Sequence, residues 1–130
     1  MTGAEKTRTQ KRLDKLIRDE RFAEATQLAS DVYQETQDHW LLAMAAYCLR
    51  QLGDLSEASR AVKVGLRDHP ACPLLLWEMG VIAESRGDRR NAIRWYLKIA
   101  DEGVAGIRRG PCFEGLAWAR GLVRDSFLAA

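Results

Sequence analysis

Proline, histidine and cysteine are all scarce in this chain of 130 residues, and each scarcity excludes something. Three prolines leave long segments free to form helices, because proline breaks a helix interior. His39 and His69 have no second ligand at metal-binding spacing, so we expect no metal site. Three cysteines are an odd number without Cys-x-x-Cys spacing, which argues against a disulfide framework and favours a reducing compartment.

Long apolar runs are also missing. No segment approaches the ~20 apolar residues that span a bilayer, and the polar start MTGAEKTRTQKR is unlike a secretory signal. We therefore expect a soluble, cytoplasmic protein that does not cross a membrane. The net charge of +2 is unevenly distributed: residues 1–18 and 86–130 each carry +4, whereas residues 19–85 carry −6. The chain thus has basic ends around an acidic middle.

Helix-forming sequence, in contrast, is abundant. From Arg8 onward, apolar residues recur at three- and four-residue spacing, which is the pattern of amphipathic helices. Gly53, Pro70 and Gly87 are typical of helix ends. The pattern predicts a flexible N-terminus at residues 1–7 and a longer loop at residues 103–111. It predicts helices at about residues 8–21, 22–34, 38–52, 56–69, 73–86, 89–101 and 111–128.

An internal repeat is the most informative feature. The Gly-Asp dipeptide at Gly53 recurs at Gly87, which is 34 residues later, and Ala58 recurs as Ala92. A fixed period of this length in a helical chain indicates stacked helix-turn-helix units. Small residues also recur where the two helices of a hairpin must cross closely. These residues are Ala46, Ala58, Gly80 and Ala92.

The repeat resembles the tetratricopeptide repeat (TPR), which has small, large and aromatic residues at fixed places in two helices. Residues 73–106 match through Leu76, Met79, Gly80, Ala83, Gly87, Asp88, Ala92 and Tyr96. Residues 39–72 match through Leu42, Ala45, Ala46, Leu49, Gly53, Asp54, Ala58, Val62, Gly65 and Pro70. Residues 5–38 match through Leu13, Leu16, Phe22, Ala25 and Leu28, without glycine in the turn.

The resemblance implies the architecture. We expect an all-α, right-handed stack of about three TPR-like helical hairpins plus a C-terminal helix. A single domain at residues 8–130 would hold repeats at about residues 5–38, 39–72 and 73–106 and the terminal helix at 111–128. A single hairpin cannot bury its apolar face, so about three are needed for stability.

In such stacks the first helix of each repeat lines a concave groove. The face predicted to look into it comprises Trp40, Ala43, Tyr47, Arg50, Leu74, Trp77, Val81 and Glu84. This set is apolar and aromatic, and aromatic residues are enriched among binding hot spots. We therefore predict a non-catalytic protein–protein interaction module, an adaptor or chaperone-like protein, whose groove binds an apolar peptide or helix of a partner protein.

Alternatives remain open for this surface. The terminal helix at residues 111–128 could fill the groove, or a rotation of about 100° could make Trp40 and Trp77 core residues. That helix is apolar on more than one side, so a self-associating scaffold, such as a homodimer formed through residues 111–128, is the second hypothesis. Nucleic-acid binding through the basic ends is a minor alternative, because the acidic middle opposes it.

Signals of catalysis are weak. Asp54 and Glu57 are typical of turns and helix caps rather than of an acid–base pair. The glycine-containing segment GIRRGP follows no strand and lacks the lysine of a phosphate-binding loop. Cys48 has small and apolar neighbours, so we expect a core residue rather than a nucleophile. The sequence therefore predicts no enzyme, no cofactor and no metal.

Overall fold

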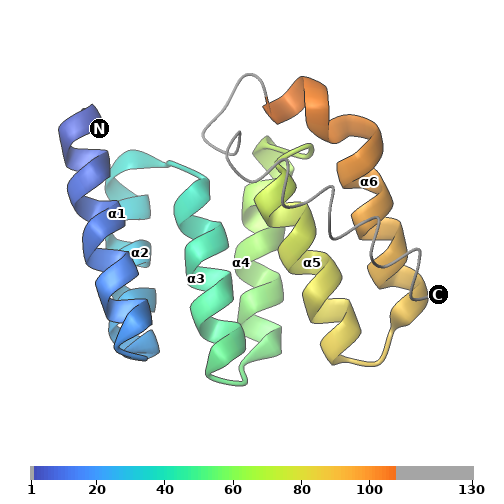
Figure 1. Ribbon diagram of the computed structural model, residues 1–130, viewed down its shortest axis with the longest axis horizontal. Helices are drawn as coiled ribbons and strands as arrows, with labels where there is room; N and C mark the ends of the chain where they lie inside the picture. Colours follow the sequence, from blue (N-terminus) through green and yellow to red (C-terminus); the bar gives the residue numbers. More distant parts are fainter. Residues whose placement is uncertain (1, 108–130) are drawn as a thin grey trace.

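The computed structural model describes residues 2–107, with side chains through Ile99, and every element in this range is an α-helix (Figure 1). The helices are α1 (Gly3–Arg18), α2 (Phe22–Thr36), α3 (Trp40–Gln51), α4 (Leu55–Asp68), α5 (Pro73–Ser85) and α6 (Arg89–Ile107). Each packs against the next, and α3 also packs against α5. The prediction of an all-α protein is confirmed for this range, in which no helix is both long and apolar enough to cross a lipid bilayer.

The repeated Gly-Asp dipeptides form two equivalent turns. Gly53 and Gly87 have φ of +83° and +77°, a left-handed conformation that glycine adopts without a steric cost. In the first turn, the N–H of Gly53 donates to the carbonyl of Arg50 at 3.0 Å, and the N–H of Asp54 donates to that of Leu49 at 2.9 Å. These two bonds are those of a Schellman motif, which satisfies the last carbonyls of a helix.

The aspartate of each dipeptide then starts the next helix. Asp54 accepts a hydrogen bond from the backbone N–H of Glu57 at 3.1 Å, and Asp88 accepts one from that of Asn91 at 3.3 Å. A side-chain oxygen at this place satisfies one of the free N–H groups of the first turn. The glycine therefore ends one helix and the aspartate caps the next, which explains why the pair recurs.

The turn between α1 and α2 has the same hydrogen bonds without glycine. Glu20 has φ of +57° in place of Gly53, and its N–H donates to the carbonyl of Ile17 at 3.0 Å. The N–H of Arg21 donates to the carbonyl of Leu16 at 2.8 Å. The backbone thus repeats a third time, although the sequence signal for the turn is missing.

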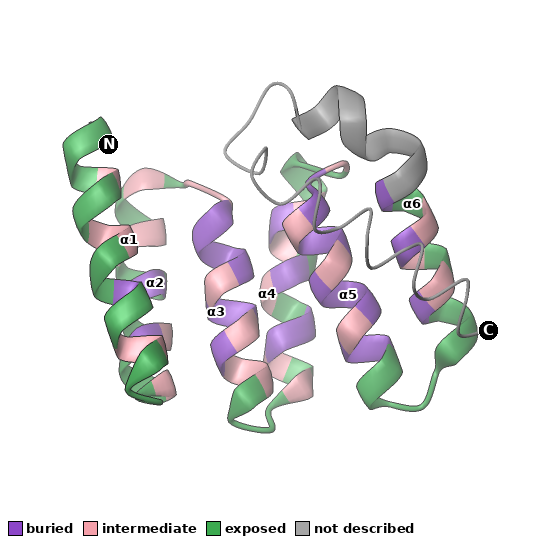
Figure 2. Cartoon of the chain, in the orientation of Figure 1, coloured by how far each residue is buried: buried purple, intermediate pink, exposed green. Residues whose placement is uncertain are grey.

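Small residues allow the paired helices to approach closely. Ala46, Ala58 and Ala92 are fully buried, as their repeat positions predict. At Gly80, an added Cβ would lie 2.7 Å from Cδ1 of Tyr96, so only glycine leaves room for this ring between α5 and α6. Figure 2 shows that burial is greatest in α3 and α5, which lie in the middle of the row, whereas α1 is mostly exposed.

Two predicted boundaries were wrong. α1 begins at Gly3 rather than at Arg8, because the hydroxyl oxygen of Thr2 accepts from the N–H of Glu5 at 3.1 Å and caps the helix; the expected flexible N-terminus is helical from its third residue. α6 continues to Ile107, so the predicted loop at residues 103–111 is helical in its first part. A glycine inside a helix costs about 1 kcal/mol, which the rest of the helix can offset.

Two starting residues also differ from the sequence prediction. α4 starts at Leu55 with Asp54 as its cap, one residue before the predicted start at Ser56, and α3 starts at Trp40 with His39 as its N-cap, two residues after the predicted start at residue 38. The remainder of the predicted loop and the terminal helix at residues 111–128 lie outside the described residues.

Candidate functional site

The eight residues of the predicted groove face fall into two groups. Trp40 and Ala43 are 4% and 2% exposed and belong to the packed interior. The other six are partly or fully exposed: Tyr47, Arg50, Leu74, Trp77, Val81 and Glu84. The structure therefore corrects the placement of Trp40 and Ala43 on an open surface. It leaves a smaller face that runs from the second half of α3 across α5.

Trp40 is buried because helices cover α3 on several sides. Its ring packs in one cluster with Leu13 of α1 and Ala29 of α2, and the ammonium group of Lys6 lies 5.9 Å from the ring centroid. Ala43 belongs to a second cluster, together with Val62 of α4. Of the alternatives drawn from the sequence, a core position thus applies to Trp40, whereas Trp77 stays partly exposed.

An ion pair between Arg50 of the remaining face and Glu78 joins α3 to α5. The Nε of Arg50 donates to one carboxylate oxygen of Glu78 at 3.1 Å, and its Nη2 donates to the other at 3.4 Å. The two side chains are 14% and 6% exposed. A buried charge is costly unless it is paired and hydrogen-bonded, and here each charge has the other as its partner.

The same guanidinium group lies between two aromatic rings. Its central carbon is 5.2 Å from the ring centroid of Tyr47 and 5.6 Å from that of Trp77. Both distances fit cation–π contacts, which hold an aromatic ring against a charge. Phe22 of α2 adds a third aromatic ring to this group, because its ring and that of Tyr47 form a T-shaped pair with centroids 6.4 Å apart. Arg50 thus links aromatic residues from neighbouring hairpins into one platform.

Burial dominates the ionisation of Glu78. It raises the pKa of this carboxyl above its usual value of 4.5, and the hydrogen bond and charge of Arg50 oppose that rise without cancelling it. The carboxylate is therefore harder to form in the folded protein than in the unfolded chain. The negative charge opposite Arg50 carries a desolvation cost.

Two other buried groups show the same effect. Burial raises the pKa of the Cys48 thiol to about 11, so the thiol stays protonated at neutral pH and is a poor nucleophile. Burial also raises the pKa of Tyr96, and the negative charge of Glu84, together with a hydrogen bond to that carboxylate, raises it further. The prediction that Cys48 is a core residue is confirmed, since its side chain is fully buried.

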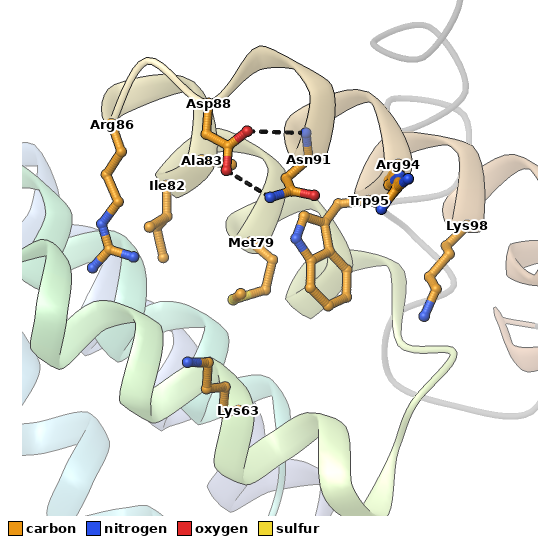
Figure 3. Close-up of a pocket in the computed structure, with 10 residues that line it drawn as sticks. All are labelled: Lys63, Met79, Ile82, Ala83, Arg86, Asp88, Asn91, Arg94, Trp95 and Lys98. Atoms are coloured by element: carbon orange, nitrogen blue, oxygen red, sulfur yellow. Dashed lines mark hydrogen bonds between the residues drawn. The ribbon is translucent and has the colours of Figure 1, made fainter.

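The structure also shows a cleft that the sequence did not reveal. It measures about 710 Å³ and lies between α4, α5 and α6. Figure 3 shows Lys63 of α4 on one side and Trp95 of α6 on the other, with Met79 of α5 between them. Four cations line it, namely Lys63, Arg86, Arg94 and Lys98. One signal was available in the sequence: Arg90, Arg94 and Lys98 recur every fourth residue on α6.

The structure also brings the two histidines together. The rings of His39 and His69 stack with centroids 3.7 Å apart and planes inclined by 19°. Parallel stacked imidazoles cannot both point their lone pairs at a single ion, so we interpret this pair as packing between the two helix ends. No group of three or more His, Cys, Asp or Glu side chains suited to a metal ion occurs among residues 2–99.

Comparison with protein-family models finds no match to this sequence, and comparison with curated proteins finds none either.

Proposed function

We propose that this chain is a non-catalytic protein-interaction module with the right-handed, TPR-like stacking of hairpins that its repeat suggests. The equivalent Gly-Asp turns 34 residues apart support this proposal, because their hydrogen bonds repeat as well as their sequence. Small residues at the closest helix contacts also support it. Repeats of this kind contact mainly their neighbours and create extended binding surfaces.

The proposed binding face consists of Tyr47, Arg50, Leu74, Trp77, Val81 and Glu84, without Trp40 and Ala43. The observation that carries the proposal is the Arg50–Glu78 pair, which fixes Tyr47 and Trp77 from two different helices around one guanidinium group. A rigid aromatic surface loses little conformational entropy when a partner binds. Because Glu78 neutralises Arg50, the platform favours an apolar segment of a partner protein.

Trp77 and Leu52 allow a direct test. Trp77 lies on the proposed face, whereas Leu52 is a large hydrophobic residue, 51% exposed, at the end of α3. We expect Trp77→Ala to weaken partner binding by about 2 kcal/mol or more, as for a hot spot, and Leu52→Ala to leave it unchanged. The measurement is quantitative capture from a native lysate with each variant, followed by titration of the captured protein.

Thermal melts must accompany this comparison. A Trp77→Ala protein that melts close to the wild type but loses a partner kept by Leu52→Ala would support the face. Equal capture by both variants would contradict it. A large fall in the melting temperature would instead mark Trp77 as a core residue, and Tyr47→Ala would then test the same face.

A further inference from the structure

Basic side chains line the cleft between α4, α5 and α6. Lys63 comes from α4, Arg94 and Lys98 come from α6, and Arg86 is the C-cap residue that follows α5; all four side chains are exposed. Within the described part of the chain, none of them makes an ion pair. The cleft also contains Asp88, but its carboxylate already accepts from the side-chain amide of Asn91 at 2.6 Å and from the backbone N–H of Asn91. The lining therefore has an excess of positive charge.

The floor of the cleft is apolar. Met79, Ile82 and Ala83 of α5 contribute aliphatic and thioether surface, and all three are nearly buried, at 8%, 1% and 8% exposure. The indole of Trp95 forms one wall, with the ammonium group of Lys98 5.2 Å from its ring centroid. An apolar floor below a cationic rim fits a ligand that has both an apolar group and negative charges.

This cleft is separate from the proposed binding face of α3 and α5. Ile82 and Ala83 share one face of α5 with Met79, because they follow it by three and four residues. At about 100° per residue, Trp77 and Val81 lie on the opposite side of that helix. A ligand in the cleft would therefore leave the proposed face of α3 and α5 free.

We propose that the cleft binds an acidic segment of a partner protein that carries aliphatic side chains flanked by Asp or Glu. The aliphatic side chains would lie on Met79 and Ala83, and the flanking carboxylates would pair with cations on both sides of the cleft. Lys63 and Arg94 face it from α4 and α6 respectively (Figure 3). Complementary charge gives both orientation and a faster encounter.

Charge and floor chemistry both favour a protein segment over a nucleic acid. A single-stranded nucleic acid needs a positive groove that follows its backbone and aromatic faces on which its bases stack. Here the ammonium group of Lys98 already lies over the ring of Trp95, and the floor is aliphatic. Residues 19–85 carry a net charge of −6, so a long polyanion would meet repulsion elsewhere on the molecule.

A labelled peptide tests the proposal directly. The probe is fluorescein-labelled DEDLLEDE, titrated with the full chain at low salt and followed by fluorescence anisotropy. We expect saturable binding that weakens as salt screens the charges. We also expect Lys63→Glu/Arg94→Glu to weaken it by about tenfold or more, and DEDSSEDE to bind at least about fivefold more weakly. The absence of binding, or affinity unchanged by these replacements, would overturn the proposal.

A matched control separates the cleft from overall charge. Arg8 and Lys11 are exposed on α1, so Arg8→Glu/Lys11→Glu changes the net charge equally but far from the cleft in the chain. It should keep affinity within about twofold of the wild type, and an equal loss would reduce the effect to nonspecific charge. An unlabelled oligothymidine that displaces the probe more effectively than unlabelled peptide would overturn the proposal in favour of nucleic acid.

The four substituted side chains are all exposed, so we expect both double variants to fold like the wild type. Melting temperatures close to the wild type are expected. Trp77→Ala should leave DEDLLEDE binding intact, so failure of the cleft and failure of the aromatic face give different results.

Discussion

At the scale of single residues, the Arg50–Glu78 pair connects two helices at a high cost in hydration free energy. A buried ion pair loses hydration on both sides, and its mutual attraction often only offsets that loss. What it adds here is geometry, because one guanidinium group faces Glu78, Tyr47 and Trp77 together. We therefore interpret the pair as a device that positions two aromatic rings rather than as a main source of stability.

The raised pKa of Glu78 predicts an unusual pH dependence. The folded protein holds this proton at pH values where the unfolded chain has already released it, starting at about 4.5. The contribution of Glu78 to stability is then fully present below that pH and is lost as pH rises through the higher folded pKa. Glu78→Gln removes the titration, so the wild type should lose stability relative to this variant between about pH 4.5 and neutrality.

Urea unfolding of both proteins across this range measures the difference. A gap between the two free energies of unfolding that stays constant with pH would contradict the prediction. A gap that changes in the opposite direction would mean that Arg50 lowers the pKa of Glu78 below 4.5 despite the burial.

At the scale of elements, the turns that join α1 to α2, α3 to α4 and α5 to α6 share one backbone conformation but differ in sequence. Gly53 and Gly87 take the left-handed position at no steric cost, whereas Glu20 takes it with a full side chain. A left-handed conformation costs an L-residue about 1–2 kcal/mol. Glycine there costs about 0.5–1 kcal/mol in lost chain entropy. The difference between these two free-energy costs favours glycine at the left-handed position of the turn.

Glu20→Gly should therefore raise the free energy of unfolding by about 0.5–1 kcal/mol. The matched change, Gly53→Ala, should lower it by about 1 kcal/mol, because the same conformation then carries a Cβ. Steric clash does not affect this comparison, because an added Cβ at Gly53 meets nothing within 4 Å. Chemical denaturation measures both. A loss of stability in Glu20→Gly would show that the Glu20 side chain contributes more than its strain costs.

These elements also show how far the sequence can predict the fold. Gly53 and Gly87 end helices for a local reason, so the repeat and most helices were predictable. The first turn gave no such signal, because Glu20 adopts a conformation that its residue type disfavours. The extension of α6 beyond residue 101 was missed since glycine only weakens a helix, and continuation depends on the remaining residues.

The site was less predictable than the fold. Periodicity placed Trp40 and Trp77 on equivalent faces of their helices, but burial depends on what packs against each face. α1 and α2 cover Trp40, whereas Trp77 keeps some exposure. The Arg50–Glu78 pair links residues 28 positions apart, and the cleft depends on side chains from three helices. Such features arise from packing between elements, and the basic residues at every fourth position of α6 indicated only one side of the cleft.

At the scale of the whole molecule, burial is uneven along the row of helices. Leu13 is the one buried residue of α1, whereas α3 and α5 bury most of their residues. Fully burying a leucine contributes about 1.5–3 kcal/mol, which is little for a helix that must also be ordered. In a molecule whose parts contact mainly their neighbours, local stability follows local burial.

We therefore expect α1 to open separately from the rest of the described helices. Native-state hydrogen exchange should give α1 amides the lowest protection and α3 and α5 amides the highest, because α1 buries only Leu13 fully and packs Leu16 and Ile17 only partly against the neighbouring cluster. Leu13→Ala should remove the remaining protection of α1 while leaving that of α5 within about 0.5 kcal/mol, since distant sites act independently. If Leu13→Ala lowered protection equally in α1 and α5, the helices would unfold as one cooperative unit, and the row would behave as a single globular core.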